Sequence, residues 1–232
     1  MPSLVPERIQ PRNDAAPHSA GRYVLYWMEQ SQRAVHNPAL TYAIEAANDA
    51  GVPVRVVFAL RDDDPAANAR HYTFMLEGLR ETQQTLADRG IRMDVYRGDP
   101  ADVALTHAAD AVELVTDRGY LRQQRAWRTH VAHEAPCRVV QVEGDVVVPV
   151  ETASDKPEYA ARTIRPKIHE HLERFLTLPD PVTPDHDADA LDVPDGLPLD
   201  DVPALVDRLG LDDSVPPVTP LFRGGTAEAE AI

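Results

Sequence analysis

The side chains that can do chemistry in this sequence form a mixed apolar and charged set. Such a set suits the binding of a flat aromatic ligand better than bond-breaking catalysis. Its members lie at the ends of three predicted strands or just after them, within residues 28–33, 58–61 and 117–121. The predicted ligand-binding residues are Met28, Arg33, Phe58, Leu60, Asp117, Arg118 and Leu121. An alternative interpretation places Trp27 and Phe58 in the core and leaves the arginines as solvated loop residues.

Sequence motifs for catalysis or metal binding are weak or missing. The first predicted strand is not followed by G-x-G-x-x-G, and neither G-x-x-x-x-G-K-[ST] nor G-x-S-x-G occurs. Dinucleotide, phosphate-loop and hydrolase sites therefore lose their usual support. His130 and His133 lie one helical turn apart near Glu134, but no third metal ligand is evident, which favours surface histidines. His169 and His171 are two residues apart and point in different directions on a helix.

Alternating strand and helix patterns must position these side chains. Residues 54–60 form a nearly continuous apolar run, typical of a strand that is covered on both faces of a parallel sheet. Apolar residues recur at helical spacing in 68–89, and Gly90 follows as the C-cap. The predicted strands are 23–27, 54–60, 91–96, 111–116 and 138–142, and the predicted helices are 38–49, 68–89, a short one from 99, and 121–134.

Five strand and helix alternations with short connections predict an α/β fold. We expect a Rossmann-like, doubly wound, five-stranded parallel sheet of order 3-2-1-4-5, with right-handed crossovers and helices on both faces. Ligands of such sheets bind outside the carboxyl ends of the strands, where the strand order reverses. Here that crevice is expected between the first and fourth strands, and it is the place assigned to the predicted ligand-binding residues.

Composition divides the chain into four parts, namely residues 1–21, 22–152, 153–176 and 177–232. The first is rich in Pro, Ser and Asn and is expected to be a disordered arm, and the second is the α/β domain. The third has a helical pattern that Pro166 is expected to break into two short helices. The fourth is predicted to be an acidic linker, partly helical, with its one helical period at 201–209.

The charge balance is strongly acidic. The 232 residues carry a net charge of −15, with 24 Asp, 14 Glu, 21 Arg and only two Lys. Such a surface suits high salt, which screens self-repulsion, so we infer a halophilic source. It also argues against this chain being the main contact for a polyanion.

Without a basic and apolar leader or a run of 18 apolar residues, we expect a cytoplasmic protein with no membrane contact. The single cysteine, Cys137, is expected to be a buried bystander.

Three segments carry a family resemblance. Residues 154–168 read S-D-K-P-E-Y-A-A-R-T-I-R-P-K-I, residues 26–28 read Y-W-M, and residues 72–79 read Y-x-F-M-L-x-G-L. Together they resemble the N-terminal domain of class II cyclobutane pyrimidine dimer DNA photolyases. The resemblance covers residues 22–173, with a weaker echo at 216–225.

The resemblance implies a light-harvesting antenna domain, whose chromophore in some members is an 8-hydroxy-5-deazaflavin. Catalysis in that family is light-driven electron transfer from FAD, which is held by a helical domain. The resemblance implies that residues 177–232 include the start of this domain and that the rest of it is missing. The chain alone is therefore expected to be inactive, to need a separate FAD-binding chain, and to meet damaged DNA only indirectly. The charged segment after the α/β domain is expected to dock that partner, through Lys156, Tyr159, Arg162, Arg165 and Lys167.

The sequence departs from the family pattern at two places. It has H-N-P-A-L at residues 36–40 where the family commonly has D-N-W-A-L, and E-G-D-V-V-V-P-V-E at 143–151 where it has D-A-H-N-V-V-P-x-W. Two family tryptophans are thus replaced. Besides the antenna half of a photolyase, two alternatives stay open: a stand-alone flavin- or nucleotide-binding module, and a non-functional fragment.

Overall fold

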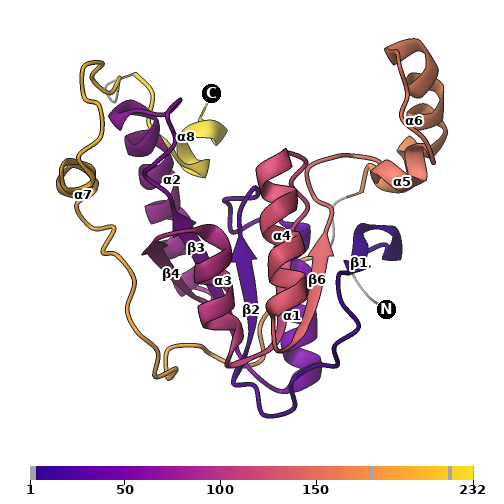
Figure 1. The fold of residues 1–232 in the computed structure, drawn as a ribbon, viewed down its shortest axis with the longest axis horizontal. Coiled ribbons are helices and arrows are strands. Elements are labelled where there is room, and N and C mark those ends of the chain that lie inside the picture. Colours follow the sequence, from indigo (N-terminus) through magenta and orange to yellow (C-terminus); the bar gives the residue numbers. More distant parts are fainter. Residues whose placement is uncertain (1–3, 178–179, 219–220, 232) are drawn as a thin grey trace.

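A computed structural model describes residues 4–177, 180–218 and 221–231. One mixed sheet, mostly parallel, runs through its centre with helices on both faces (Figure 1). The sheet has the order β1-β6-β5-β2-β3-β4. Its strands are β1 (Ile9–Pro11), β2 (Tyr23–Met28), β3 (Val54–Leu60), β4 (Arg92–Arg97), β5 (Ala111–Asp117) and β6 (Arg138–Val142). The last five follow the predicted parallel order, so the predicted α/β fold is confirmed.

The central strand β2 is buried along its whole length because it pairs with β3 on one side and β5 on the other, both in parallel. Its alternate side chains enter two separate cores. Tyr26 and Met28 belong to the core under α1 (Pro38–Ala50) and α2 (Ala69–Ala87). Trp27 belongs to the core under α3 (Pro100–Ala108) and α4 (Arg122–Glu134).

The helices α1 and α3 begin at capping residues that can be recognised in the sequence. The side chain of Asn37 accepts a hydrogen bond from Leu40 N and caps α1, which ends at Gly51 with φ of 68°. Asp99 caps α3 in the same way, with Pro100 as the first helical residue. These caps fix where each helix starts relative to the strand before it.

The N-terminal part is not a structureless arm, and this prediction is wrong for residues 6–11. A short 3₁₀ turn, η1 (Pro6–Arg8), leads into β1, which pairs with β6 in antiparallel orientation and adds a sixth strand. The guanidinium of Arg8 donates to the backbone oxygens of Glu143, Val146 and Val147. The sequence prediction failed because three residues are too short for an apolar period, and the edge strand is held by backbone pairing instead.

The acidic linker covers the opposite edge of the sheet. Leu197 N donates to Val95 O at 2.7 Å, and Ala188 N donates to Gly90 O at 2.9 Å. Gly196 lies so close to β4 that a Cβ there would come within 2.6 Å of Val95 O. The linker then forms α7 (Val202–Leu209), close to the predicted period, and packs against α2. Both edges of the parallel sheet are therefore covered by polypeptide, which blocks strand addition.

The segment after β6 forms α5 (Val150–Ala153) and α6 (Ala161–Phe175), and the latter projects away from the body (Figure 1). The expected break at Pro166 does not occur, because α6 is one continuous helix through this residue. Pro166 lies in the second turn and removes only the hydrogen bond to the carbonyl of Arg162, an exposed residue whose oxygen water can solvate.

The final helix, α8 (Thr226–Glu230), contacts α2. No helix in the described ranges is both long and apolar enough to cross a bilayer.

Candidate functional site

A cavity of about 300 Å³ lies over the carboxyl ends of β2 and β3. This is the edge of a doubly wound sheet at which ligands bind, next to the reversal of strand order between β2 and β5. Its lining combines aromatic, apolar and amide side chains with a few charges. The residues are Trp27, Met28, Glu29, Gln32, Phe58, Ala59, Arg61, Asp64, Ala67, His71, Tyr72, Met75, Pro100, Gln124 and Trp127.

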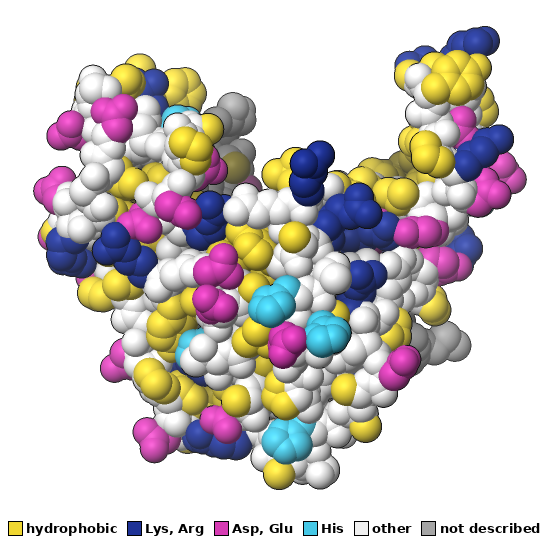
Figure 2. All heavy atoms as spheres, in the orientation of Figure 1, with side chains coloured by type: hydrophobic (Ala, Val, Ile, Leu, Met, Phe, Trp, Pro, Cys, Tyr) yellow, Lys and Arg dark blue, Asp and Glu magenta, His cyan; other side chains and the backbone are white. Residues whose placement is uncertain are grey.

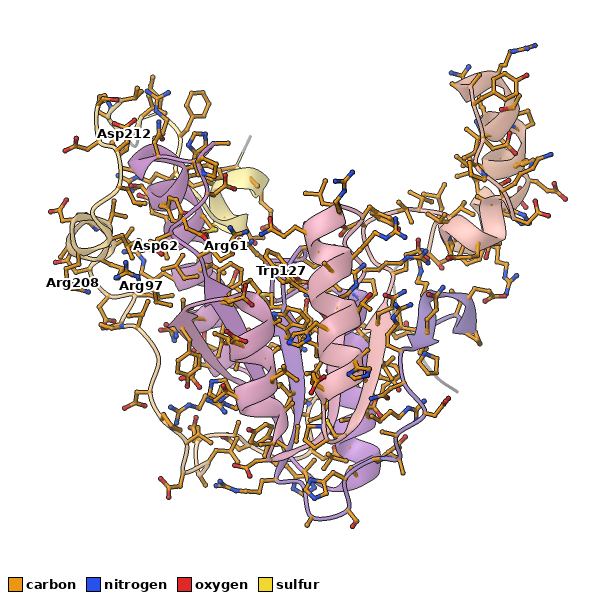
Figure 3. All side chains as sticks on the ribbon, viewed as in Figure 1. Arg61, Asp62, Arg97, Trp127, Arg208 and Asp212 are labelled. Carbon is orange, nitrogen blue, oxygen red and sulfur yellow. The ribbon has the colours of Figure 1, made fainter. Side chains whose placement is uncertain are left out.

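The walls of the cavity come from helices on both faces of the sheet. Tyr72 and Met75 of α2 stand on one side, and Trp127 of α4 stands on the other. Arg61, which follows β3, lies over the Trp127 ring with its guanidinium carbon 5.1 Å from the ring centre (Figure 3). A flat, polarisable ligand can lie between such surfaces, because aromatic rings and guanidinium planes both stack on ring systems.

The floor of the site is fixed by Asp117, the last residue of β5. Its Oδ2 accepts hydrogen bonds from the backbone N–H groups of Glu29, Gln30 and Ser31, at 3.0, 3.0 and 3.3 Å. The hydroxyl of Tyr26 donates to the same carboxyl at 3.1 Å. Burial raises the pKa of Asp117, while these donors act against the rise. Asp117 thus ties the loop after β2 to β5 and orients the residues that line the cavity.

Glu29 and Arg128 form a buried and poorly matched ion pair beside the cavity. Their side chains are 6% and 5% exposed, and the closest nitrogen and oxygen are 3.9 Å apart, too far for a hydrogen bond. Among the described residues, Glu29 Oε2, Arg128 NH1 and the Trp27 indole nitrogen have no hydrogen-bond partner. Burial, more than any other cause, raises the pKa of Glu29 to about 8, with Arg128 opposing and Asp117 adding to the rise.

The raised pKa of Glu29 predicts a dependence of stability on pH. The folded state holds a proton on Glu29 up to about pH 8, whereas the unfolded chain loses it near 4.5, so stability falls as the pH rises between these values. Over this range the wild-type protein is expected to lose on the order of 5 kcal/mol of stability, at about 1.4 kcal/mol per pKa unit, and Glu29→Gln should remove that loss. Urea unfolding of both proteins at pH 5 and pH 9 measures it. Equal pH dependence in the two proteins would contradict the assignment.

Of the seven predicted ligand-binding residues, the structure brings only Met28 and Phe58 to this cavity. Leu60 is fully buried in the core, and Leu121 is 68% exposed at the start of α4. The guanidinium of Arg118 pairs with Glu143 at 3.0 Å and with Glu151. Asp117, described above, shapes the site from beneath.

Arg33 lies in a different hollow, of about 430 Å³, between the turn η1 and the end of α6. Its lining includes the segments that follow β2 and β6, and its aromatic rings are those of His36 and Phe175. The smaller cavity has Trp27, Phe58, Tyr72 and Trp127 in its lining and is therefore the better candidate for a flat ligand.

The sequence reasoning covered Glu29 only within the range 28–33, and it did not assign Tyr72, Met75, Gln124 or Trp127 to the ligand site. Gln124 and Trp127 lie on a helix whose rotation about its axis decides which residues face the sheet. With few apolar residues in α4, no clear period indicated that rotation.

The predicted docking segment lies away from this cavity. Tyr159 is 79% exposed, and its hydroxyl accepts a hydrogen bond from Arg162 at 3.1 Å. Lys167 pairs with Glu158 at 2.6 Å and donates to Ser154 at 3.0 Å. Arg165 is exposed, as is Lys156 before the helix. Figure 2 shows the segment standing clear of the body, with basic, acidic and hydrophobic side chains on its surface.

No metal centre is evident in the described ranges, where no group of three or more His, Cys, Asp or Glu side chains is placed to hold an ion. His133 contacts Glu134 at 2.7 Å, and His130 lies exposed on the same helix. Cys137 is buried, and burial raises the pKa of its thiol to about 11, which makes it a poor nucleophile.

Comparison with known proteins decides the family. The DNA photolyase family profile matches residues 24–185, well over half of the chain. The chain belongs to the DNA photolyase family. A deoxyribodipyrimidine photo-lyase of Methanothermobacter thermautotrophicus is 46% identical over 232 residues, covering 97% of this chain and 49% of that protein. Those of Potorous tridactylus and Arabidopsis thaliana are 39% and 37% identical over 66% of this chain, and the matches cover 30% and 32% of their length. The chain thus spans half or less of the photo-lyases that it matches.

Solved photolyases share the fold. The archaeal photolyase of Sulfolobus tokodaii, solved with two FAD molecules and implying a novel light-harvesting cofactor, matches 90% of this chain with a TM-score of 0.67 and 17% identity. The class III photolyase of Agrobacterium tumefaciens matches 77% with a TM-score of 0.56 and 20% identity. At these identities the likeness establishes a photolyase N-terminal fold.

Proposed function

We propose that this chain is the antenna half of a class II type deoxyribodipyrimidine photo-lyase. In this proposal it binds a light-harvesting chromophore, and a FAD-binding part outside these 232 residues carries out repair and contacts the damaged DNA. The observation that carries the proposal is the cavity over β2 and β3, with Tyr72 and Met75 on one side and Trp127 on the other. Its walls fit a flat ring system such as 8-hydroxy-5-deazaflavin or a related chromophore. An antenna needs no acid, base or nucleophile from this chain.

The exposed docking segment supports the part of the proposal in which this chain binds a partner. Tyr159 is a large aromatic side chain with little burial that lies just before the projecting helix α6. The guanidinium carbon of Arg162 is 5.9 Å from the centre of its ring. Aromatic and arginine side chains are enriched at protein interfaces. The segment therefore suits contact with the FAD-binding part.

A stand-alone flavin- or nucleotide-binding module is the second candidate. What favours it is that all walls of the cavity come from this chain, so that a ligand needs no partner in order to bind. The two candidates differ at the docking segment. A partner covers that surface in the first, and the segment stays in solvent in the second.

An absorption and fluorescence spectrum of the chain purified from its own host in high salt tests the proposal. We expect a band in the near-ultraviolet or blue that denaturation releases, or binding of added deazaflavin or flavin. A colourless protein that binds neither compound would contradict a chromophore site and leave a non-functional fragment. Pull-down of a FAD-containing chain by the wild-type protein, and not by a Tyr159→Ser variant, would separate the antenna half from the stand-alone module.

Trp127→Ala is expected to weaken binding of a deazaflavin or flavin by about 1–3 kcal/mol, because stacking of a ring on an aromatic side chain contributes about that much. Fluorescence titration measures the affinity. His130→Ala, which changes an exposed residue on the same helix, is the matched control and should leave affinity unchanged. If both variants bind like the wild-type protein, the ligand does not stack on Trp127.

A further inference from the structure

The strongest unexplained feature of the molecule is a set of unpaired polar atoms in and beside the cavity. Glu29 lines the cavity, and its Oε2 is buried without a partner within the described structure. An unsatisfied buried polar oxygen is costly, and the cost falls when a ligand or a water hydrogen-bonds to it. Protonated Glu29 still has acceptor capacity, so a ligand can donate to its carboxyl group. The feature itself therefore points to a bound hydrogen-bond donor.

The protein's own nearest groups leave Glu29 Oε2 without a hydrogen bond. The Thr116 hydroxyl lies near enough to lower the pKa of Glu29, but neither Thr116 Oγ1 nor Glu29 Oε2 has a hydrogen-bond partner in the described structure. The backbone N–H of Glu29 is held by Asp117, which fixes where the side chain starts. Arg128, the nearest cation, is held elsewhere, because its NH2 donates to Gly119 O at 2.5 Å and its Nε to Gln141 at 3.3 Å. The 3.9 Å separation between Glu29 and Arg128 is thus set by contacts on both sides.

The polar groups around the cavity also indicate which hydrogen-bonding edge of a ligand would be complementary to it. Gln124 accepts from Leu121 N at 3.1 Å through its side-chain oxygen, which leaves its NH₂ group as a donor. Gln32 lines the same cavity and uses one N–H of its amide to reach Glu29 O at 3.2 Å. One acceptor accompanied by amide donors complements a ring edge on which an N–H is flanked by carbonyl oxygens.

We propose that Glu29 is the specificity-determining residue of the cavity and accepts a hydrogen bond from the ring N–H of a cyclic imide edge. Its ligand class is then the planar heteroaromatics that carry such an edge, as flavins and deazaflavins do. The apolar and aromatic walls bind the rings, and Glu29 fixes which edge enters first. This inference rests on the proposed chromophore site and deepens it.

The test uses the purified 232-residue protein with two probes, lumiflavin and 3-methyllumiflavin, which differ only in whether the imide nitrogen carries a hydrogen or a methyl group. We expect the wild-type protein to bind lumiflavin at least about tenfold more tightly, measured by fluorescence titration in high salt. Glu29→Gln keeps an acceptor oxygen and should keep the preference. Glu29→Met fills the same space without an acceptor and should lose it.

The Met and Gln variants separate hydrogen bonding from steric exclusion of the methyl group, because steric exclusion alone would persist in Glu29→Met. Glu170→Gln, an exposed change on α6, is the charge-matched control and should behave like the wild-type protein. Near-ultraviolet circular dichroism checks that each variant is folded.

Two failures are distinguishable. A wild-type protein that binds both probes equally, with Glu29→Met unchanged, overturns the role of Glu29 and leaves the chromophore site standing. In that case an ordered water satisfies the carboxyl group. A wild-type protein that binds neither probe, nor any deazaflavin, overturns the proposed site and this inference together.

Discussion

Replacement of Arg55 by alanine is expected to lower the free energy of unfolding by about 3–5 kcal/mol, the cost of breaking a buried ion pair. Arg55 is 1% exposed and lies in β3. Its guanidinium donates to Asp94 at 3.1 and 3.2 Å and to the hydroxyls of Tyr23 and Tyr96 at 3.3 and 2.7 Å. It also lies 3.0 Å from His107 Nδ1. Removal of the side chain leaves four groups without this donor, of which Tyr23, Asp94 and His107 are buried.

Arg92→Ala is the matched control, because Arg92 also pairs with Asp94, at 3.0 Å, but is partly exposed. Partly solvated pairs contribute little, so we expect a loss of about 1 kcal/mol or less. Urea unfolding monitored by circular dichroism measures both variants. Equal losses would mean that the cluster around Arg55 is solvated and not a buried network.

The state of His107 follows from the same cluster. Burial, with the nearby charge of Arg55, lowers the pKa of His107 to about 4. The imidazole is therefore neutral at pH 7 and can accept the hydrogen bond from Arg55 through Nδ1. Protonation of His107 in acid would place a second cation beside Arg55, so this network destabilises as the pH falls from about 6.5 towards 4.

Most of the fold could be predicted from the sequence because each parallel strand is marked by its own composition. β3 is an apolar run ended by a charge, and α1 and α3 begin at residues whose caps are visible, Asn37 and Asp99. What could not be predicted depends on backbone pairing without a side-chain signature. Both β1 and the linker at Leu197 attach to sheet edges through N–H and C=O groups, which any residue other than proline supplies.

The position of the candidate site on the sheet could be predicted from the sequence, but most of the residues that line it could not. The rule that ligands bind at the carboxyl ends of the strands led to Met28 and Phe58 and to the correct edge of the sheet. It also led to Arg118, which contacts Glu143 and Glu151 instead of the cavity. A loop residue at this edge of the sheet can point into the cavity or away from it. Its direction depends on contacts with residues that are distant in the sequence.

Asp117→Ala is expected to lower both the free energy of unfolding, by about 3 kcal/mol, and the affinity for a flat aromatic ligand, by at least about tenfold. Without the carboxylate, the N–H groups of Glu29, Gln30 and Ser31 lose their common acceptor, and the Tyr26 hydroxyl loses a partner. The loop after β2 then leaves its position, and Glu29 leaves the cavity with it. Thermal or urea unfolding and fluorescence titration of the same protein preparations measure the two effects.

Asp117→Asn separates positioning from ligand contact. The amide keeps one oxygen that can accept from the loop, so its loss of stability should be about 1 kcal/mol, and its loss of affinity should be correspondingly small. If Asp117 instead touched the ligand, as its place at the end of β5 suggested, affinity would fall while stability changed little. Because the structure places its carboxyl group against the loop backbone and Tyr26, both quantities should change together across the Asn and Ala variants. A proportional change would show that the end of β5 builds the site through the loop after β2.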